Sequence, residues 1–187
     1  MSNTSYLFLA DGFEEIEAVT TADVLRRAGI PLQTVAVGVA GLAVTGAHGI
    51  TITADVAMND IADRPAALLI LPGGMPGAEN LAANPALLAR VQRQLDDNLP
   101  LAAICAAPAV VLGKVRTTRP RVLTCYPGYE HLLAHHHVRP DGLVIDDNLV
   151  TAKGPSFTIS FALELIAGER GYAAARAVNA GLLLNIN

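Results

Sequence analysis

The stretch that decides the fold is Pro100-Leu-Ala-Ala-Ile-Cys105-Ala-Ala-Pro-Ala-Val-Val-Leu-Gly113, an apolar run that passes directly into an alanine-rich segment. The run up to Ile104 predicts a buried strand. Pro108 and Gly113 predict a helix over the second half, because first-turn amides have no intrahelical partner and glycine suits the left-handed residue after a helix. We therefore expect Cys105 at a strand-to-helix elbow, on the sheet edge where open α/β folds bind ligands.

Two interpretations of Cys105 follow from this position. The positive end of the helix dipole favours a thiolate, which would lower the pKa of Cys105 below the free value of about 8.5 and make the residue a nucleophile. Free cysteine is also among the most buried residue types, so a packed and inert side chain is the more frequent outcome. The elbow alone leaves both interpretations open.

The amino-acid composition limits the classes of protein to which the chain can belong. The 187 residues, 52% hydrophobic and 16% charged, suit a single α/β domain over residues 1–187 and argue against disorder. A net charge of -4 gives no basic surface for nucleic acid. No apolar run reaches the roughly 18 residues of a membrane span, and residues 1–5 lack the features of a signal peptide. We therefore expect a cytoplasmic protein that binds neither nucleic acid nor membranes.

The order of apolar runs and periodic segments predicts a mainly parallel sheet with helical connections. Strands are expected over 6–10, 31–37, 66–71, 100–104, 121–124, 143–145 and 149–152, and a small hairpin over 42–44 and 50–53. Helices are expected over 15–28, from 84 or 85, after the elbow, from 156, and over 173–184. The three adjacent histidines at 135–137 lack a second set of ligands, so we expect a solvated loop there and no metal site.

Two further segments supply candidate site residues. Glu17 shares a helical stripe with Val24 and Ala28, so it points either to the sheet or, as a surface acid, to the helix dipole. Glu14 and Glu15 have the pattern of ordinary first-turn acids. In the loop 72–77, the amides of Gly73 and Gly74 are candidate donors to an anion, although glycines beside proline are also common in plain turns.

Four ordered motifs resemble the ThiJ/PfpI superfamily, specifically its DJ-1 branch and there its bacterial members. They are Ala10-Asp-Gly-Phe-Glu-Glu-Ile-Glu17-Ala-Val19, Leu71-Pro-Gly-Gly74, Ala102-Ala-Ile-Cys105-Ala-Ala-Pro108 and Lys153-Gly-Pro155. The resemblance implies a flavodoxin-like three-layer sandwich with helices on both faces of the sheet. It also implies a homodimer in which the first helix and the Ala47-His48 region lie near the partner.

The same resemblance implies the roles of the site residues. Cys105 is the reactive, oxidation-sensitive nucleophile and Glu17 its partner carboxyl group, and the two should share one proton, with the pKa of Cys105 lowered and that of Glu17 raised. Backbone amides of Gly73, Gly74 and Ala106 would face the sulfur.

The pocket residues complete this set. Tyr126, Gly154 and Pro155 would line the pocket, and no metal or cofactor is implied. Cys125 is either a resolving thiol for oxidised Cys105 or a packed bystander.

Two departures from the family pattern narrow the function. Ala106 stands where peptidase-like members carry histidine, so we expect no peptidase activity. Tyr126 stands where some members place a histidine near the thiol, and a tyrosine cannot act as a base at neutral pH.

The resemblance implies a cofactor-independent glyoxalase III or deglycase acting on methylglyoxal and glyoxal or their early adducts. The alternative is an oxidative-stress sensor or holdase chaperone in which Cys105 is oxidised to sulfinate.

Overall fold

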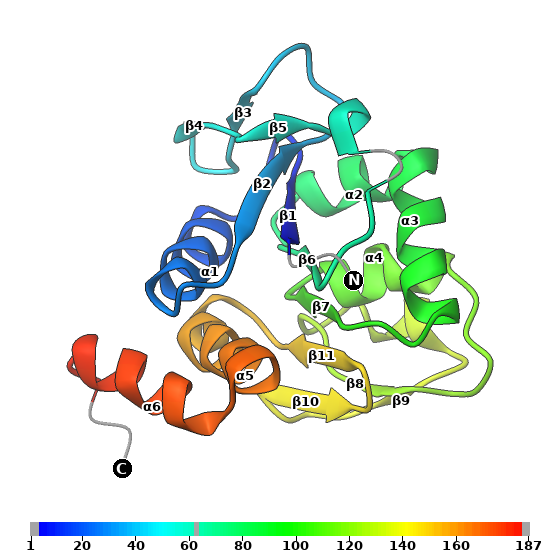
Figure 1. The fold of residues 1–187 in the computed structure, drawn as a ribbon. Helices are drawn as coiled ribbons and strands as arrows, with labels where there is room; N and C mark the ends of the chain where they lie inside the picture. The colour runs from blue at the N-terminus through cyan, green and yellow to red at the C-terminus, as the bar shows by residue number, and fades with distance from the viewer. Residues whose placement is uncertain (1–3, 62–63, 185–187) are drawn as a thin grey trace.

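The computed structural model describes residues 4–61 and 64–184. In this part of the chain the main sheet has seven strands in the order β10-β11-β7-β6-β1-β2-β5 (Figure 1). Their bounds are β1 Ser5–Leu9, β2 Leu32–Ala36, β5 Val56–Ala57, β6 Leu69–Leu71, β7 Leu101–Ile104, β10 Leu143–Asp146 and β11 Leu149–Ala152. Neighbouring strands pair parallel except β10 and β11. The predicted, mainly parallel sheet is confirmed.

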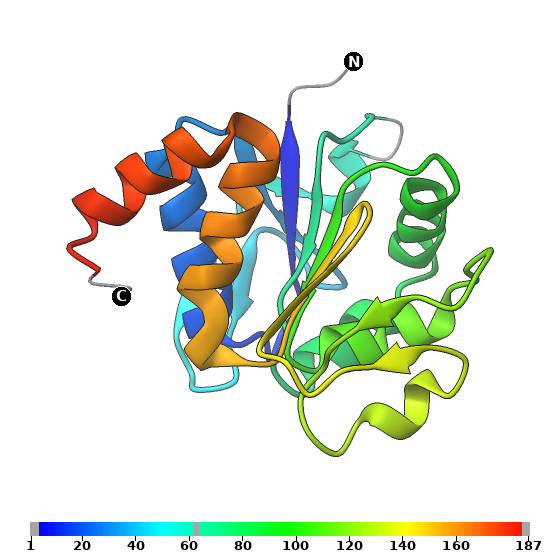
Figure 2. The same ribbon diagram turned by 90° about the horizontal axis from the view of Figure 1, so that it is seen from below.

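Helices cover both faces of this sheet (Figure 2). One face carries α1 (Glu15–Arg27), α5 (Thr158–Arg170) and α6 (Tyr172–Gly181), and the other carries α2 (Gly77–Ala82), α3 (Pro85–Asp96) and α4 (Ala107–Val110). Successive side chains of β1 alternate between the two cores, Tyr6 and Phe8 in one and Leu7 and Leu9 in the other. The result is the expected flavodoxin-like three-layer sandwich.

Local signals explain where several elements begin and end. Helix α1 has acids in its first turn and Arg26 and Arg27 in its last, and Gly29 follows in the left-handed region with φ +69°. Helix α3 is capped by Asn84, whose side chain accepts a hydrogen bond from the Leu87 N–H at 3.0 Å. The predicted hairpin is confirmed as β3 (Ala43–Thr45) paired antiparallel with β4 (Thr51–Thr53).

Helix α2 and strand β5 were not predicted, α6 ends at Gly181 before the expected residue 184, and two predicted elements differ in form. Helix α4 is a single turn followed by a 3-10 turn at Leu112–Lys114 (η2), and Gly113 lies inside this turn instead of ending a longer helix. An added Cβ on Gly113 would lie 3.0 Å from the Leu132 carbonyl oxygen, so the 3-10 turn η3 (Glu130–Leu133) packs closely there. The expected strand 121–124 is the short β8 (Val122–Leu123), which pairs with β9 (His137–Val138) outside the main sheet.

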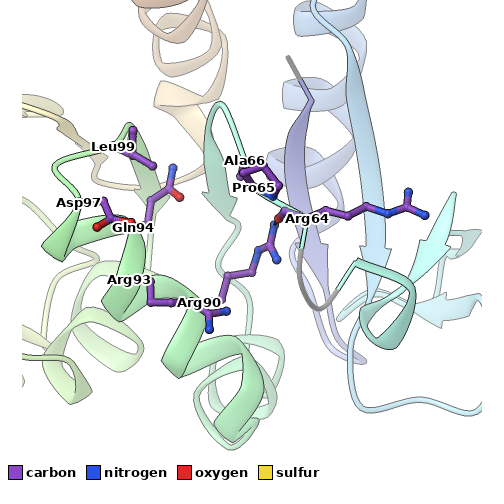
Figure 3. A pocket seen from close by; sticks show the side chains of 8 residues that line it. All are labelled: Arg64, Pro65, Ala66, Arg90, Arg93, Gln94, Asp97 and Leu99. Carbon is purple, nitrogen blue, oxygen red and sulfur yellow. Dashed lines mark hydrogen bonds between the residues drawn. The ribbon is translucent and has the colours of Figure 1, made fainter. Parts of the chain in front are cut away.

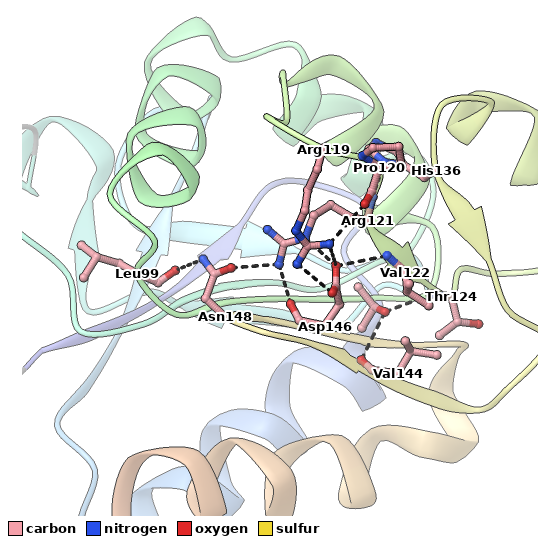
Figure 4. Close-up of polar contacts among 11 residues, drawn as sticks. Leu99, Arg119, Pro120, Arg121, Val122, Thr124, His136, Val144, Asp146 and Asn148 are labelled. Carbon is pink, nitrogen blue, oxygen red and sulfur yellow. Dashed lines mark hydrogen bonds and ion pairs between the residues drawn. The ribbon is translucent and has the colours of Figure 1, made fainter.

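A polar network holds β8 against the β10–β11 hairpin (Figure 4). The guanidinium group of Arg121 is buried and donates to Asp146 Oδ2 at 2.6 Å and to Asn148 Oδ1 at 2.8 Å. The Val122 N–H donates to the same Asp146 oxygen at 3.1 Å. Because β8 leads directly into Cys125 and Tyr126, this network also fixes the segment that reaches the Cys105 elbow.

Candidate active site

Cys105 lies at the elbow between β7 and α4, as the sequence predicted. Its φ of +65° is in the left-handed region, which costs energy for a side chain with a Cβ and marks a constrained position. Main-chain hydrogen bonds hold it on both sides: its N–H donates to the Ala152 oxygen at 2.9 Å, and its oxygen accepts from the Tyr126 N–H at 2.7 Å. Only 8% of Cys105 is exposed. The elbow therefore presents a nearly buried thiol in a fixed orientation.

Glu17 enters the same site from the first turn of α1. The residue is fully buried, which excludes the surface interpretation. Its Oε2 accepts a hydrogen bond from the Gly73 N–H at 2.8 Å, and its carboxyl group interacts with the Cys105 thiol. Within the described ranges, Oε1 has no donor in good hydrogen-bonding geometry. A proton carried on this carboxyl group, donated toward the sulfur, would satisfy that oxygen.

The loop after β6 supplies the backbone amides of Gly73 and Gly74, and these two amides do not share one partner as expected. The N–H groups of Gly74 and Ala106 hydrogen-bond the Cys105 sulfur, whereas the Gly73 N–H is used by Glu17. The expectation that Gly73 faces the sulfur is therefore corrected: this amide holds the partner carboxyl group. An added Cβ on Gly73 would lie 2.5 Å from the Cys105 Cβ, so only glycine allows the two segments to approach this closely.

Burial dominates the electrostatics of the pair. It raises the pKa of the Glu17 carboxyl group to about 7. Burial and then the adjacent Glu17 charge raise the pKa of the Cys105 thiol to about 12. Desolvation opposes the lowering of the thiol pKa that the elbow position predicts, and α4 is only one turn long, so the lowered pKa of Cys105 stays a prediction.

The two groups titrate as a unit. Burial raises the pKa of both groups and the charge of one opposes ionisation of the other, so the pair resists losing both protons. Once one proton has left, the other is shared by Glu17 and Cys105. The N–H groups of Gly74 and Ala106 favour the form in which the sulfur carries the charge, since they lower the pKa of the thiol.

The expected pocket residues lie to one side of the elbow. The Tyr126 ring is 45% exposed and meets the Tyr129 ring edge-on, with centroids 6.4 Å apart. Gly154 lies beside this ring, since an added Cβ there would be 3.4 Å from Tyr126 Cδ2. Pro155 begins the 3-10 turn Pro155–Phe157 (η4) that leads into α5.

Cys125 is 2% exposed, and burial raises the pKa of its thiol to about 11. Its role as a resolving thiol stays a prediction.

The sequence missed a polar contact next to this site. Glu15, expected to be an ordinary first-turn acid, is buried, and its carboxylate accepts the His48 N–H at 2.7 Å and lies 2.8 Å from His48 Nδ1. Gly46 leaves room for the Glu15 side chain, because an added Cβ at Gly46 would overlap the Glu15 carboxylate. The partners are 33 residues apart, so the only local signal was a glycine and a histidine in the turn of a hairpin.

A separate cavity lies at the opposite edge of the sheet, before β6 and β7 begin (Figure 3). Its lining includes Arg90, whose guanidinium group donates to the Ile61 carbonyl at 2.8 Å and stacks 4.9 Å from the centre of the Tyr6 ring. Because its lining residues precede β6 and β7, the cavity lies at the opposite end of these strands from Cys105, which follows the carboxyl end of β7. The cavity is therefore not part of the candidate active site.

The fold and site together define an α/β protein with a cysteine at a strand-to-helix elbow beside a buried glutamic acid. The sequence profile of the DJ-1/PfpI family matches residues 4–168, and the chain belongs to this family.

Known relatives extend this assignment. Protein DJ-1 homolog B of Arabidopsis thaliana is 37% identical over 180 residues, which are 96% of this chain and 41% of that protein. The chain therefore spans less than half the length of that relative. The glutathione-independent glyoxalase DJR-1.2 of Caenorhabditis elegans is 34% identical, covering 84% of this chain and 83% of that protein.

A solved structure, oxidized DJ-1 of Toxoplasma gondii, superposes with a TM-score of 0.92 at 30% identity, covering 98% of this chain and all of that one. These three relatives are eukaryotic, so the resemblance to bacterial members stays a prediction. Among the described residues, no helix has both the length and the apolar character needed to cross a bilayer.

Proposed function

We propose that this protein is a cofactor-independent glyoxalase or deglycase that acts on methylglyoxal and glyoxal or on their early adducts. The observation that carries the proposal is the fully buried Glu17 beside the constrained Cys105, with two backbone amides directed at the sulfur. The name of the nematode relative, a glutathione-independent glyoxalase, supports the same chemistry.

The proposed reaction begins with addition of the Cys105 thiolate to the aldehyde carbon. A carbon–sulfur bond forms, and the carbonyl oxygen takes the Glu17 proton to give a hemithioacetal. The Glu17 carboxylate then removes the proton from the former aldehyde carbon and returns it to the neighbouring carbon, while the hydroxyl proton passes from the oxygen on the sulfur-bearing carbon to the oxygen on its neighbour. The enediol intermediate thereby becomes a thioester. Water cleaves this thioester to lactate from methylglyoxal, or glycolate from glyoxal, and restores the thiol.

The backbone amides at the site have two different roles in the proposed reaction. Gly74 and Ala106 are placed to stabilise negative charge on sulfur or on the oxygen that forms beside it. The Gly73 N–H fixes the orientation of Glu17, so that the other carboxyl oxygen remains for proton transfer. Deglycase activity, the release of early adducts from amino or thiol groups, would use the same residues.

Peptidase activity is not part of the proposal. The residue after the nucleophile is Ala106, so no imidazole adjoins the thiol in the chain to form a Cys-His pair. Tyr126 offers a hydroxyl and an aromatic surface at the elbow, where a neutral-pH base would be needed.

The test is turnover of methylglyoxal to lactate by wild-type protein and by Cys105→Ser, Glu17→Gln and Cys125→Ser. We expect the first two variants to fall to the rate of uncatalysed thiol addition and Cys125→Ser to keep the wild-type rate. Wild-type turnover no faster than the thiol–aldehyde background contradicts the proposal.

A second candidate is a redox sensor or holdase, favoured by the two amides that could hold a sulfinate and by the oxidized state of the Toxoplasma relative. It predicts that peroxide converts Cys105 to sulfinate in Glu17→Gln as well, as read by intact mass. Oxidation without turnover would select this candidate over the enzyme.

We also propose a homodimer and a cytoplasmic location. An exposed apolar surface formed by Ile16 (56%), Val19 (45%) and Ile50 (57%) supports the dimer, because these side chains gather where α1 meets the hairpin. Light scattering should show Val19→Asp to be monomeric. The control Ile145→Asp, at an exposed apolar side chain on β10, should leave the mass unchanged.

A further inference from the structure

The residues Glu14, Glu15 and His48 lie together beside the start of α1, outside the Cys105 site. A carboxylate oxygen of each glutamate and an imidazole nitrogen of His48 lie within 4.8 Å of one another. We propose that these three side chains form a binding site for a divalent first-row transition metal ion, of which Zn²⁺ is the natural probe.

The distances suit a single ion between the three groups. His48 Nδ1 lies 2.8 Å from Glu15 Oε2 and 3.6 Å from Glu14 Oε2. Both carboxylate side chains are mostly buried, with 12% and 8% exposed, whereas the imidazole is 68% exposed. In the single chain an ion can therefore reach the site past the exposed imidazole, take the place of the proton between imidazole and carboxylate, and keep water at its open positions.

The backbone prepares Glu15 for this role. Its Oε1 accepts the N–H groups of His48 at 2.7 Å and Ile50 at 3.4 Å, which leaves Oε2 for the ion. Such outer hydrogen bonds orient a ligand and are a regular part of metal sites. Gly46 allows the turn to close over the carboxylate, since an added Cβ would overlap it at 2.3 Å.

The turn that carries His48 is also fixed to the chain before α1. The Ala47 N–H donates to the Phe13 oxygen at 2.8 Å, and the Gly12 N–H donates to the Thr45 oxygen at 2.7 Å. His48 and the two glutamates therefore come from segments that are held together by main-chain hydrogen bonds. The site is a built feature of the fold and not a chance meeting of long surface side chains.

The donor set selects the class of ion. Two carboxylates and one imidazole are suited to Zn²⁺, Co²⁺ or Mn²⁺, whereas Mg²⁺ and Ca²⁺ are held by oxygen ligands. A dication also balances the charge, because two carboxylates with a neutral imidazole carry two negative charges. Neither Glu14 nor Glu15 takes part in the reaction proposed above, so the metal site does not depend on that proposal.

The experiment is a calorimetric Zn²⁺ titration of the full chain carrying Cys105→Ser, which removes a competing thiolate ligand. We expect one ion per chain, no competition by Mg²⁺, and a loss of affinity of more than about tenfold in Glu14→Gln and in His48→Ala. The matched control is His135→Ala with His137→Ala, which removes two histidines from a solvated loop and should keep the affinity.

Two further readouts separate ligand loss from misfolding. Glu15→Gln keeps a hydrogen-bond acceptor for the His48 N–H, so a native melting temperature with lost Zn²⁺ binding supports direct ligation. In nuclear magnetic resonance spectra, Zn²⁺ should shift the His48 ring signals before those of the other histidines. No measurable binding, unchanged affinity in His48→Ala, or loss of binding in the double control would each overturn the proposal.

Discussion

Replacing Gly73 with alanine tests the closest contact in the candidate active site. The added Cβ would lie 2.5 Å from the Cys105 Cβ and 2.8 Å from Glu17 Oε2. The first distance is about 0.9 Å short of the 3.4 Å at which ordinary contact begins. Because the Ile104 oxygen lies 3.0 Å away on the same side, the elbow and the carboxyl group must move apart to admit the methyl group.

The expected size of the effect follows from that displacement. Overpacking of this kind costs about 1–3 kcal/mol of unfolding free energy. For a chain of this length each kcal/mol lowers the melting temperature by roughly 2–4 °C. A shift of about 1 Å between reacting groups lowers turnover on the order of 100-fold. We therefore expect a moderate loss of stability and a much larger loss of methylglyoxal turnover.

The assay compares lactate formation and thermal unfolding with two control glycines. Gly168→Ala lies in α5 with no neighbouring atom within 4 Å, and should be neutral or stabilising by up to about 1 kcal/mol. Gly128→Ala has a φ of +95° and open space, so it reports backbone strain without a clash. If Gly73→Ala keeps wild-type turnover, the inferred role of this close approach is wrong.

Three further predictions concern stability. Burial, and then electrostatic repulsion from the neighbouring His135 and Arg121 side chains, lower the pKa of His136, whose Nδ1 accepts the Arg121 N–H at 3.1 Å. The unfolded chain therefore binds a proton at His136 more readily than the folded chain does. The contribution of His136 to the free energy of unfolding is complete above the ordinary histidine pKa of about 6.5 and is lost as the pH falls below it. Urea unfolding should therefore show lower stability at pH 5.5 than at pH 7.5. Asp146→Ala leaves the buried Arg121 without its carboxylate and should cost about 3–5 kcal/mol in urea unfolding, against a smaller loss for Asp146→Asn. Phe161→Ala, at a fully buried ring in α5, should cost about 3–5 kcal/mol by the same measurement, and a cost under 1 kcal/mol would contradict the packing described.

The sequence predicted the sheet well because its signals are local. Apolar runs such as Leu101–Ile104 mark strands that are buried on both faces, and the alternation of strands with helices leaves a parallel order as the only simple connection. The errors lie where a distant segment decides the outcome. Gly113 lies inside a 3-10 turn that packs against Leu132, and β8 pairs outside the main sheet with β9.

The candidate site was predictable to different degrees. The elbow pattern located Cys105, but spacing alone left Glu17 undecided between surface and core, and the family resemblance was needed to favour the core. The different partners of the Gly73 and Gly74 amides depend on backbone direction at each residue, which sequence does not specify. The contact of Glu15 with His48 depends on how the hairpin folds back onto α1.

The first turn of α1 contributes side chains to two sites because residues two apart in a helix point in nearly opposite directions. Glu15 and Glu17 are two residues apart, so their side chains project about 200° apart around the helix. One carboxyl group therefore reaches the His48 turn and the other reaches Gly73 and Cys105. The two sites are joined through the main chain, where the Glu14 N–H donates to the Gly73 oxygen at 3.0 Å, and through the Glu14 carboxylate, whose charge adds to burial in raising the pKa of Glu17. Side-chain substitutions at His48 leave that hydrogen bond in place, so metal binding and dicarbonyl turnover can be removed one at a time.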